Sequence, residues 1–158
     1  MRTPSVYLET SIFNFVFADD APDKKQDTIQ LFDEIKVGKY VPFTSVYVLR
    51  ELNRAEDDKR EKMASLIDDY GVVLLDASED AEHLADAYIA RGIIPAKYGA
   101  DALHIAAASA ADLDFIVSWN FKHIVKRKTV TLTEAVNAEE GYKKIGIYSP
   151  TEVIENDE

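Results

Sequence analysis

The sequence has no cysteine and little histidine, which removes several kinds of site at once. Without cysteine, the 158 residues cannot form a disulfide, a thiolate nucleophile or a cysteine-ligated zinc or iron–sulfur centre, and an intracellular location is favoured. The only histidines are His83, His104 and His123. No two of them have the helical spacing of a metalloprotease zinc site, so a zinc centre is not expected.

Glycine motifs and long apolar runs are also missing. The six glycines form neither a phosphate-binding loop nor a dinucleotide fingerprint, and there is no G-x-S-x-G motif, which excludes nucleotide-cofactor enzymes and serine hydrolases of the common types. No apolar run approaches the roughly 18 residues of a membrane span, and the start MRTPSVYLET lacks the features of a signal peptide. We therefore expect a cytoplasmic protein that does not associate with membranes.

Acidic residues outnumber basic ones. With 29 acidic and 18 basic residues, the formal net charge is −11, which by itself disfavours a polyanionic partner. The basic residues Lys122, Lys126, Arg127 and Lys128 nevertheless form a local cluster, so nucleic acid is not excluded as a partner. The content of 47% apolar and 30% charged residues is typical of one folded domain, here residues 1–158.

Short apolar segments alternate with longer segments of helical periodicity, a pattern typical of an α/β fold. Strands are predicted at 6–8, 40–43, 72–75, 115–117 and 130–132. Helices are predicted after a cap at Ser11 and over 27–37, 45–53, 57–69, 78–91, 100–110 and 133–140. A polar loop is expected over 19–25, a short turn or helix over 120–125, and a last helical turn at Ser149-Pro150.

This order of elements predicts a central parallel sheet of strand order 3-2-1-4-5, flanked by helices. The first and fourth strands are then neighbours, and ligands of such sheets bind beyond the carboxyl ends of the strands where the winding reverses. Two polar segments fall there: Glu9-Thr10-Ser11 and Ser118-Trp119-Asn120. A functional site is therefore predicted at this edge.

Three acidic residues from separate elements have positions that suggest a shared role. Glu9 directly follows the first strand, Glu51 shares a helical stripe with apolar residues, and Asp101 begins an alanine-rich helix. Individually they could be a solvated strand-end acid, a salt-bridge partner of Arg50 or Arg54, and a first-turn acid favoured by the helix dipole. Together they are better explained by one cation, and oxygen ligands favour Mg²⁺ or Mn²⁺.

Several neighbouring side chains need an interpretation as well. Asn120 could supply an amide oxygen and Ser118 a hydroxyl group, although both residue types also stabilise turns. His104 could contact a metal or phosphate, but a hydrogen-bonded core histidine is the favoured interpretation. Asp112 and Asp114 precede the fourth strand at the opposite end of the sheet and are interpreted as solvated loop acids.

Four segments, in order, resemble the motifs of PIN-domain nucleases, and more narrowly of VapC-type toxins of toxin–antitoxin pairs. These are VYLETSIFNF, SVYVLREL, GADALHIAAA and LDFIVSWNFKHIV, which together extend from about Ser5 to Ile124. The resemblance implies a three-layer PIN-like fold and a Mg²⁺- or Mn²⁺-dependent endoribonuclease. By position, Glu9, Glu51, Asp101 and Asn120 would be metal ligands, with Ser118 as the hydroxyl residue of the fourth motif. Lys122, Lys126, Arg127 and Lys128 would contact RNA phosphates.

The match departs from the family pattern at two positions. The first motif commonly has aspartate where this chain has Glu9, and the fourth has a carboxylate where this chain has Asn120, which removes a negative charge. One alternative is therefore a catalytically weak or inactive PIN-like scaffold that binds protein or RNA. Another is a metal-dependent phosphatase acting on a small phosphoester.

The resemblance also implies partners. Similar family members form homodimers and bind a cognate antitoxin whose helix covers the site. Phe13, Phe15 and Phe17 cannot all be buried by one helical face, so at least one of them is expected at the surface, where it could contribute to such an interface.

Overall fold

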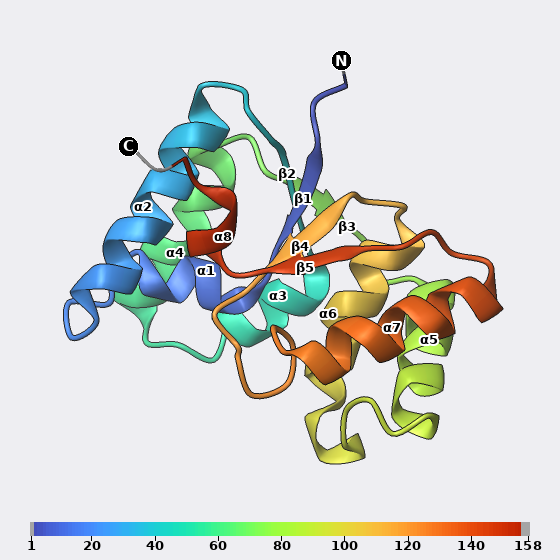
Figure 1. Cartoon of the computed structure of the whole chain (residues 1–158). Helices are drawn as coiled ribbons and strands as arrows, with labels where there is room; N and C mark the ends of the chain where they lie inside the picture. Colours follow the sequence, from blue (N-terminus) through green and yellow to red (C-terminus); the bar gives the residue numbers. More distant parts are fainter. Residues whose placement is uncertain (1, 156–158) are drawn as a thin grey trace.

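A computed structural model describes residues 2–155, which form an α/β fold around one parallel sheet (Figure 1). The strands are β1 (Ser5–Leu8), β2 (Val41–Ser45), β3 (Val73–Leu75), β4 (Phe115–Val117) and β5 (Gly146–Tyr148). Their order is β3-β2-β1-β4-β5, and every neighbouring pair is parallel. The predicted fold class and strand order are confirmed, and β1 and β4 are neighbours as expected.

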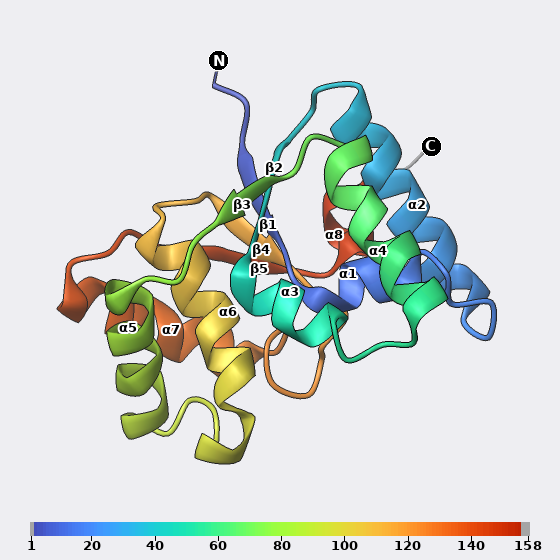
Figure 2. The same cartoon turned by 180° about the vertical axis from the view of Figure 1, so that it is seen from behind.

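Helices cover both faces of this sheet. They are α1 (Thr10–Phe15), α2 (Pro22–Lys36), α3 (Val46–Leu52), α4 (Asp57–Asp69), α5 (Glu79–Ala90), η1 (Ala96–Tyr98), α6 (Gly99–Ala110), α7 (Arg127–Glu140) and α8 (Pro150–Val153). Figures 1 and 2 show α1, α2, α4 and α8 on one side of the sheet and α5, α6 and α7 on the other. The result is the predicted three-layer arrangement.

The centre of the core explains how the site residues are brought together. Val6, Tyr7 and Leu8 of β1 are completely buried, because this strand lies in the middle of the sheet and is covered on both faces. Ala102 and Ala106 of α6 are also completely buried. Their small side chains allow α6 to pack closely, which brings its first turn, with Asp101, near the end of β1.

The predicted fifth strand at 130–132 is wrong, because these residues belong to α7. Val130, Thr131 and Leu132 have strand propensity, but Thr129, Thr133, Val136 and Asn137 are buried at helical spacing. The Asn137 side chain donates to Ser109 Oγ at 3.0 Å and also pairs with the Tyr88 hydroxyl, so α7 is fixed against α5 and α6. The fifth strand of the sheet is instead Gly146–Tyr148.

Other boundaries differ less. Helix α2 begins at Pro22, within the predicted polar loop at 19–25, because proline is favoured in the first helical turn. Glu9, and not Ser11, caps α1 by accepting from the Ser11 backbone N–H. Ser45 and Ser78 cap α3 and α5 as predicted, and residues 121–124 form a turn within the segment 120–125 where a turn or short helix was predicted.

The three phenylalanines of the first helical segment divide as the sequence suggested. Phe13 is completely buried and packs against Phe32, with ring centroids 6.2 Å apart, whereas Phe15 and Phe17 remain partly exposed. Within residues 2–155, no helix combines the length and apolar character that a membrane crossing requires.

Candidate functional site

The carboxylate of Glu9 lies at the end of β1 and is fixed by its neighbours. Its Oε1 accepts from the hydroxyl groups of Ser11 and Ser118, each at 2.6 Å, and from the Ser11 backbone N–H at 3.2 Å. Glu9 is buried, so these donors offset much of the cost of removing a carboxylate from water. Glu9 is therefore a buried carboxylate that is fixed by hydrogen bonds, and not a solvated acid at the end of a strand.

Ser118 joins the ends of β1 and β4. Besides donating to Glu9, its hydroxyl oxygen accepts from the Asn120 backbone N–H at 2.9 Å. Asn120 then directs its own Oδ1 toward the His123 backbone N–H at 2.9 Å. The turn chemistry expected for both residues is present, and the same turn holds them beside Glu9.

Asp101 lies in the first turn of α6 and belongs to this group. Burial raises the pKa of Asp101 above its usual value, and the negative charge of Glu9 raises it further. The nearby Asn120 side chain and the imidazoles of His104 and His123 oppose that increase. A carboxyl group whose ionisation is opposed by burial and by a neighbouring negative charge is a place where a cation would be stabilised.

Glu51, in the last turn of α3, has a different main partner. Its Oε1 pairs with Nε2 of His104, and the expected alternatives Arg50 and Arg54 do not reach ion-pair distance within the described chain. Burial opposes ionisation of Glu51, but the His104 hydrogen bond and charge lower its pKa overall. Glu51 is 29% exposed, so its carboxylate lies at the rim of the core.

His104 is the hydrogen-bonded core histidine that the sequence favoured. Its side chain is completely buried, and Nδ1 lies 2.8 Å from the Tyr7 hydroxyl, which in turn lies 2.7 Å from Ser45 Oγ. Burial would lower the pKa of His104, but Glu51 and the nearby acids raise it overall. The pair is thus a partly buried, charge-assisted hydrogen bond that fixes Glu51.

The predicted metal ligands are therefore divided between two adjacent groups. Glu9, Asp101, Asn120 and Ser118 form one, and Glu51 with His104 forms the other; Thr10 lies between them, with Oγ1 3.5 Å from His104 Nε2. In residues 2–155, no three acidic or histidine side chains approach closely enough to hold a metal ion by themselves.

The basic residues predicted to contact phosphate surround the turn after β4. Lys122 and Lys126 lie in the turn, and Arg127 and Lys128 begin α7. All four are exposed, and none makes an ion pair with another described residue. Their charge is therefore available to an anion, despite the acidic character of the whole chain.

One exposed aromatic residue beside this turn, Phe121, was not singled out from the sequence. Phe121 is 48% exposed directly after Asn120, and Lys24 Nζ lies 5.4 to 5.6 Å from the ring centroids of Phe15, Trp119 and Phe121. The sequence signal for it was the run Trp119-Asn120-Phe121-Lys122-His123, in which two aromatic residues flank a predicted site residue and a lysine and a histidine follow.

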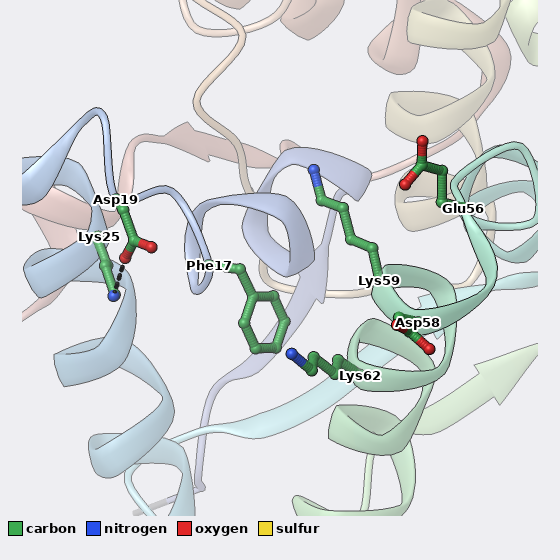
Figure 3. A pocket seen from close by; sticks show the side chains of 7 residues that line it. All are labelled: Phe17, Asp19, Lys25, Glu56, Asp58, Lys59 and Lys62. Atoms are coloured by element: carbon green, nitrogen blue, oxygen red, sulfur yellow. Dashed lines mark hydrogen bonds and ion pairs between the residues drawn. The ribbon is translucent and has the colours of Figure 1, made fainter.

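A cavity of about 430 Å³ lies away from these residues, between the α1–α2 connection and α4 (Figure 3). Phe17 lies at its centre with Lys59 and Lys62 beside it, and Asp19 pairs with Lys25 at 2.5 Å. The lining contains three lysines and three acids. This balance of charge gives no preference for an anion or a cation, and no predicted site residue lines the cavity.

Comparison with known proteins gives a fold likeness and no family assignment. No family model matches the sequence, and no curated protein matches it. Among solved structures, the chain is similar to one in VapBC2 from Rickettsia felis, determined with a DNA fragment from the promoter. The two are 20% identical, the match covers 73% of this chain and 88% of that one, and the TM-score is 0.49. At this level of similarity, the likeness carries no functional conclusion.

Proposed function

We propose that this chain is a PIN-type ribonuclease that depends on Mg²⁺ or Mn²⁺. The observation that carries the proposal is the approach of Glu9 and Asp101, with Ser118 and Asn120, at the ends of β1 and β4. This is the edge at which parallel sheets of this winding bind ligands. Three of the four sequence motifs that resemble those of PIN-domain nucleases contribute these residues in order, and the second motif contributes Glu51.

The donor set fits a hard cation. Glu9 and Asp101 offer carboxylate oxygens and Asn120 an amide oxygen, which Mg²⁺ and Mn²⁺ prefer. Mg²⁺ is commonly bound through one or two carboxylates and several waters, so two acids suffice. Glu51 would act on the ion mainly through its negative charge, because its carboxylate is engaged by both His104 and Thr10.

The chain's own groups then have separate tasks. A bound divalent cation would supply Lewis-acid polarisation of a phosphodiester and a lower pKa for water. Ser11 and Ser118 hold one oxygen of Glu9 in place, which leaves the other oxygen available. The basic residues Lys122, Lys126, Arg127 and Lys128 would bind the phosphates of the RNA strand on either side.

The same motif resemblance supports two partners. We propose a cognate antitoxin that covers the site, and a homodimer to which the partly exposed Phe15 and Phe17 could contribute. Co-expression with the product of a small neighbouring reading frame tests the first, since a cognate antitoxin would co-purify and abolish cleavage. Light scattering tests the second, and a strict monomer at high concentration would contradict the dimer.

Cleavage of a labelled RNA panel in Mg²⁺, Mn²⁺ or chelator tests the activity. We expect cleavage only with metal, together with an increased thermal midpoint, because a cation relieves the repulsion between Glu9 and Asp101. Asp101→Asn should abolish both effects. Asp112→Asn is the matched control, since Asp112 is exposed at the opposite end of the sheet. An Asp101→Asn variant that cleaves like the parent would contradict the site.

Asn120→Asp tests whether the fourth motif faces the ion. The added carboxylate would lie beside Asp101, and a close opposite charge is worth roughly 1 kcal/mol or more even when partly screened. We therefore expect Mn²⁺ to bind about tenfold more tightly by calorimetric titration, while the metal-free variant loses stability. Equal changes in melting temperature with and without Mn²⁺ would remove Asn120 from the site.

The alternative function, a scaffold without strong catalysis, has specific support. The fourth motif carries a neutral amide, and Glu51 is engaged by His104. In that case neither Mg²⁺ nor Mn²⁺ would change the melting temperature, and RNA would be bound without being cleaved. The same two experiments therefore distinguish the enzyme from the scaffold.

A further inference from the structure

We infer that the open edge of β3 binds an extended, basic segment of a partner protein, which adds to the sheet as a further strand. This surface is separate from the candidate site, since β2 lies between β3 and β1. The inference therefore goes beyond the proposed nuclease and does not depend on it. Figure 2 shows β3 (Val73–Leu75) as the last strand on its side of the sheet, with α4 leading into it and α5 following.

The edge of β3 is open in two respects. Val73 and Leu74 are 45% and 42% exposed, and because successive strand residues point to opposite faces, the strand is uncovered on both faces. Its only neighbour in the sheet is β2, and in the described chain residues 73–75 make no backbone–backbone hydrogen bond outside that pairing. The outward N–H and C=O groups of β3 can therefore pair with another strand.

A cavity of about 120 Å³ adjoins the end of this strand. Leu75 and Asp76 line one side of it, and Ser78 lines the rest together with alanines of α5 and of the end of α6. Small-molecule sites usually have about 300 Å³ or more, so this cavity suits a single side chain. A residue that pairs with Leu75 in an added strand points to the same face of the sheet, which directs its side chain toward the cavity.

The charges around β3 indicate which side chain fits. From Met63 to Ala90 the chain has seven acidic residues and no lysine or arginine. Asp68 and Asp69 precede the strand and Asp76 follows it; all three are exposed, and none takes part in an ion pair within the described chain. A lysine or arginine of the added strand would pack its alkyl chain against the alanines and place its charge beside Asp76.

The same charges disfavour other occupants. A second copy of this chain that paired its own β3 with this one would bring two sets of acids together, and the net charge of −11 opposes that contact further. An RNA strand would meet the same repulsion. Exposed apolar side chains on a strand that lies between acids are instead complementary to an extended segment of β-branched residues with basic ends.

Fluorescence anisotropy with a labelled synthetic peptide tests the inference, and chelator can be present because β3 contributes no candidate metal ligand. The peptide KKTVTVTKK alternates threonine and valine between lysine pairs. We expect it to bind the parent at least about tenfold more tightly than EETVTVTEE. Methylation of its backbone amides should also weaken binding, because it removes the N–H groups of the added strand. Amide hydrogen exchange of residues 73–75 should slow when the lysine peptide is bound.

Variants of the protein locate the binding. Asp76→Asn should weaken the lysine peptide about fivefold. Ala110→Leu, which places a larger side chain at the cavity, should weaken it while leaving β3 unchanged. Asp86→Asn is the matched control, since it removes one charge from an exposed acid of α5 that does not line the cavity. Melting temperatures establish that each variant is folded.

Three results would overturn the inference: no binding of the lysine peptide, equal binding of the lysine and glutamate peptides, or an Asp76→Asn variant that binds like Asp86→Asn. Protection of residues 73–75 that grows with protein concentration in the absence of peptide would overturn it as well, because it would assign the edge to a second copy. None of these measurements uses RNA cleavage. Their failure therefore leaves the proposed nuclease untouched, and an inactive nuclease leaves this inference untouched.

Discussion

At the residue scale, the side chains that surround an acidic residue determine whether that residue contributes to the candidate site or stabilises the fold. Glu9 and Asp114 lie at opposite ends of the central strands, and each accepts hydrogen bonds from serine. The groups around them differ. Glu9 faces another acid, Asp101, whereas Asp114 faces Arg2 at 2.6 Å and Lys143 at 3.3 Å. Asp114 is thus paired with two basic side chains, while no described basic side chain lies within ion-pair distance of Glu9 or Asp101.

The sequence identified these residues better than it identified their partners. The positions of Glu9, Ser118 and Asn120 directly after strands predicted their meeting, because parallel strands end at the same edge. The interpretation of Asp114 as a solvated loop acid was wrong, since it binds the Ser5 backbone and side chain across the sheet. Such a contact joins residues more than a hundred positions apart, and no local pattern encodes it.

Asp114→Asn should make the free energy of unfolding depend less on pH under acidic conditions. Hydrogen bonds from Ser5, followed by Lys143 and Arg2, lower the pKa of Asp114 from 3.8 to about 2. A carboxyl group with a lowered folded pKa stabilises the protein above its unfolded pKa and loses that contribution as the pH falls toward the folded pKa. We expect the variant to lose about 1–2 kcal/mol at pH 7, reduced by partial exposure.

Urea unfolding at a series of pH values measures this effect. The difference between Asp114→Asn and the parent should shrink as the pH falls from about 4 to about 2, the window set by the two pKa values. Asp112→Asn is the control, since this exposed acid lies 3.8 Å from the same Lys143. A difference that stays constant across the window would show that packing, and not charge, holds Asp114.

At the scale of elements, buried polar side chains determine the secondary structure where intrinsic helix and strand propensities alone do not predict it. The sequence predicted the helix at Asp57–Asp69 with its observed bounds, because its apolar period and charged face agree. It failed only near the start of α7, at residues 130–132, where β-branched residues favoured a strand; the helix predicted over 133–140 lies within α7. The buried Asn137 can satisfy its amide only through Tyr88, Ser109 and the Lys143 carbonyl, which belong to other parts of the chain. Only tertiary structure provides these partners.

Asn137→Ala should therefore destabilise the protein far more than its neighbours on α7. The variant leaves the buried Tyr88 and Ser109 hydroxyl groups without this amide, and an unsatisfied buried polar group costs about 1–3 kcal/mol. Thr131→Ala, exposed on the same helix, should change the free energy of unfolding by less than about 0.5 kcal/mol. Chemical denaturation of both variants gives the comparison. Equal effects would mean that the network does not anchor α7.

At the scale of the whole molecule, a strongly acidic chain carries a basic turn. The net charge of −11 means that acidic side chains repel one another in the folded state, which lowers its stability. The same net charge repels RNA at long range. The basic residues after β4 act only locally, within about 10 Å at 0.1 M salt. Stability and the proposed RNA binding would therefore respond to different charges: stability to the excess of acidic residues, and RNA binding to the basic residues after β4.

Added salt should for this reason stabilise the protein while it weakens RNA binding. Screening reduces the repulsion among acids, so the melting temperature at pH 7 should rise with KCl and should stay nearly constant near pH 4.7, the isoelectric point. RNA affinity should fall with a logarithmic slope of about −0.7 per phosphate contact. Lys122→Ala should reduce that slope by about one contact while leaving the salt dependence of melting intact, because one exposed lysine changes the net charge little.

Calorimetric melting and anisotropy over one KCl series measure both the melting temperature and the RNA affinity. A melting temperature that falls with KCl at pH 7 would mean that the surface ion pairs outweigh the net repulsion, and an unchanged slope in Lys122→Ala would place the RNA elsewhere on the surface.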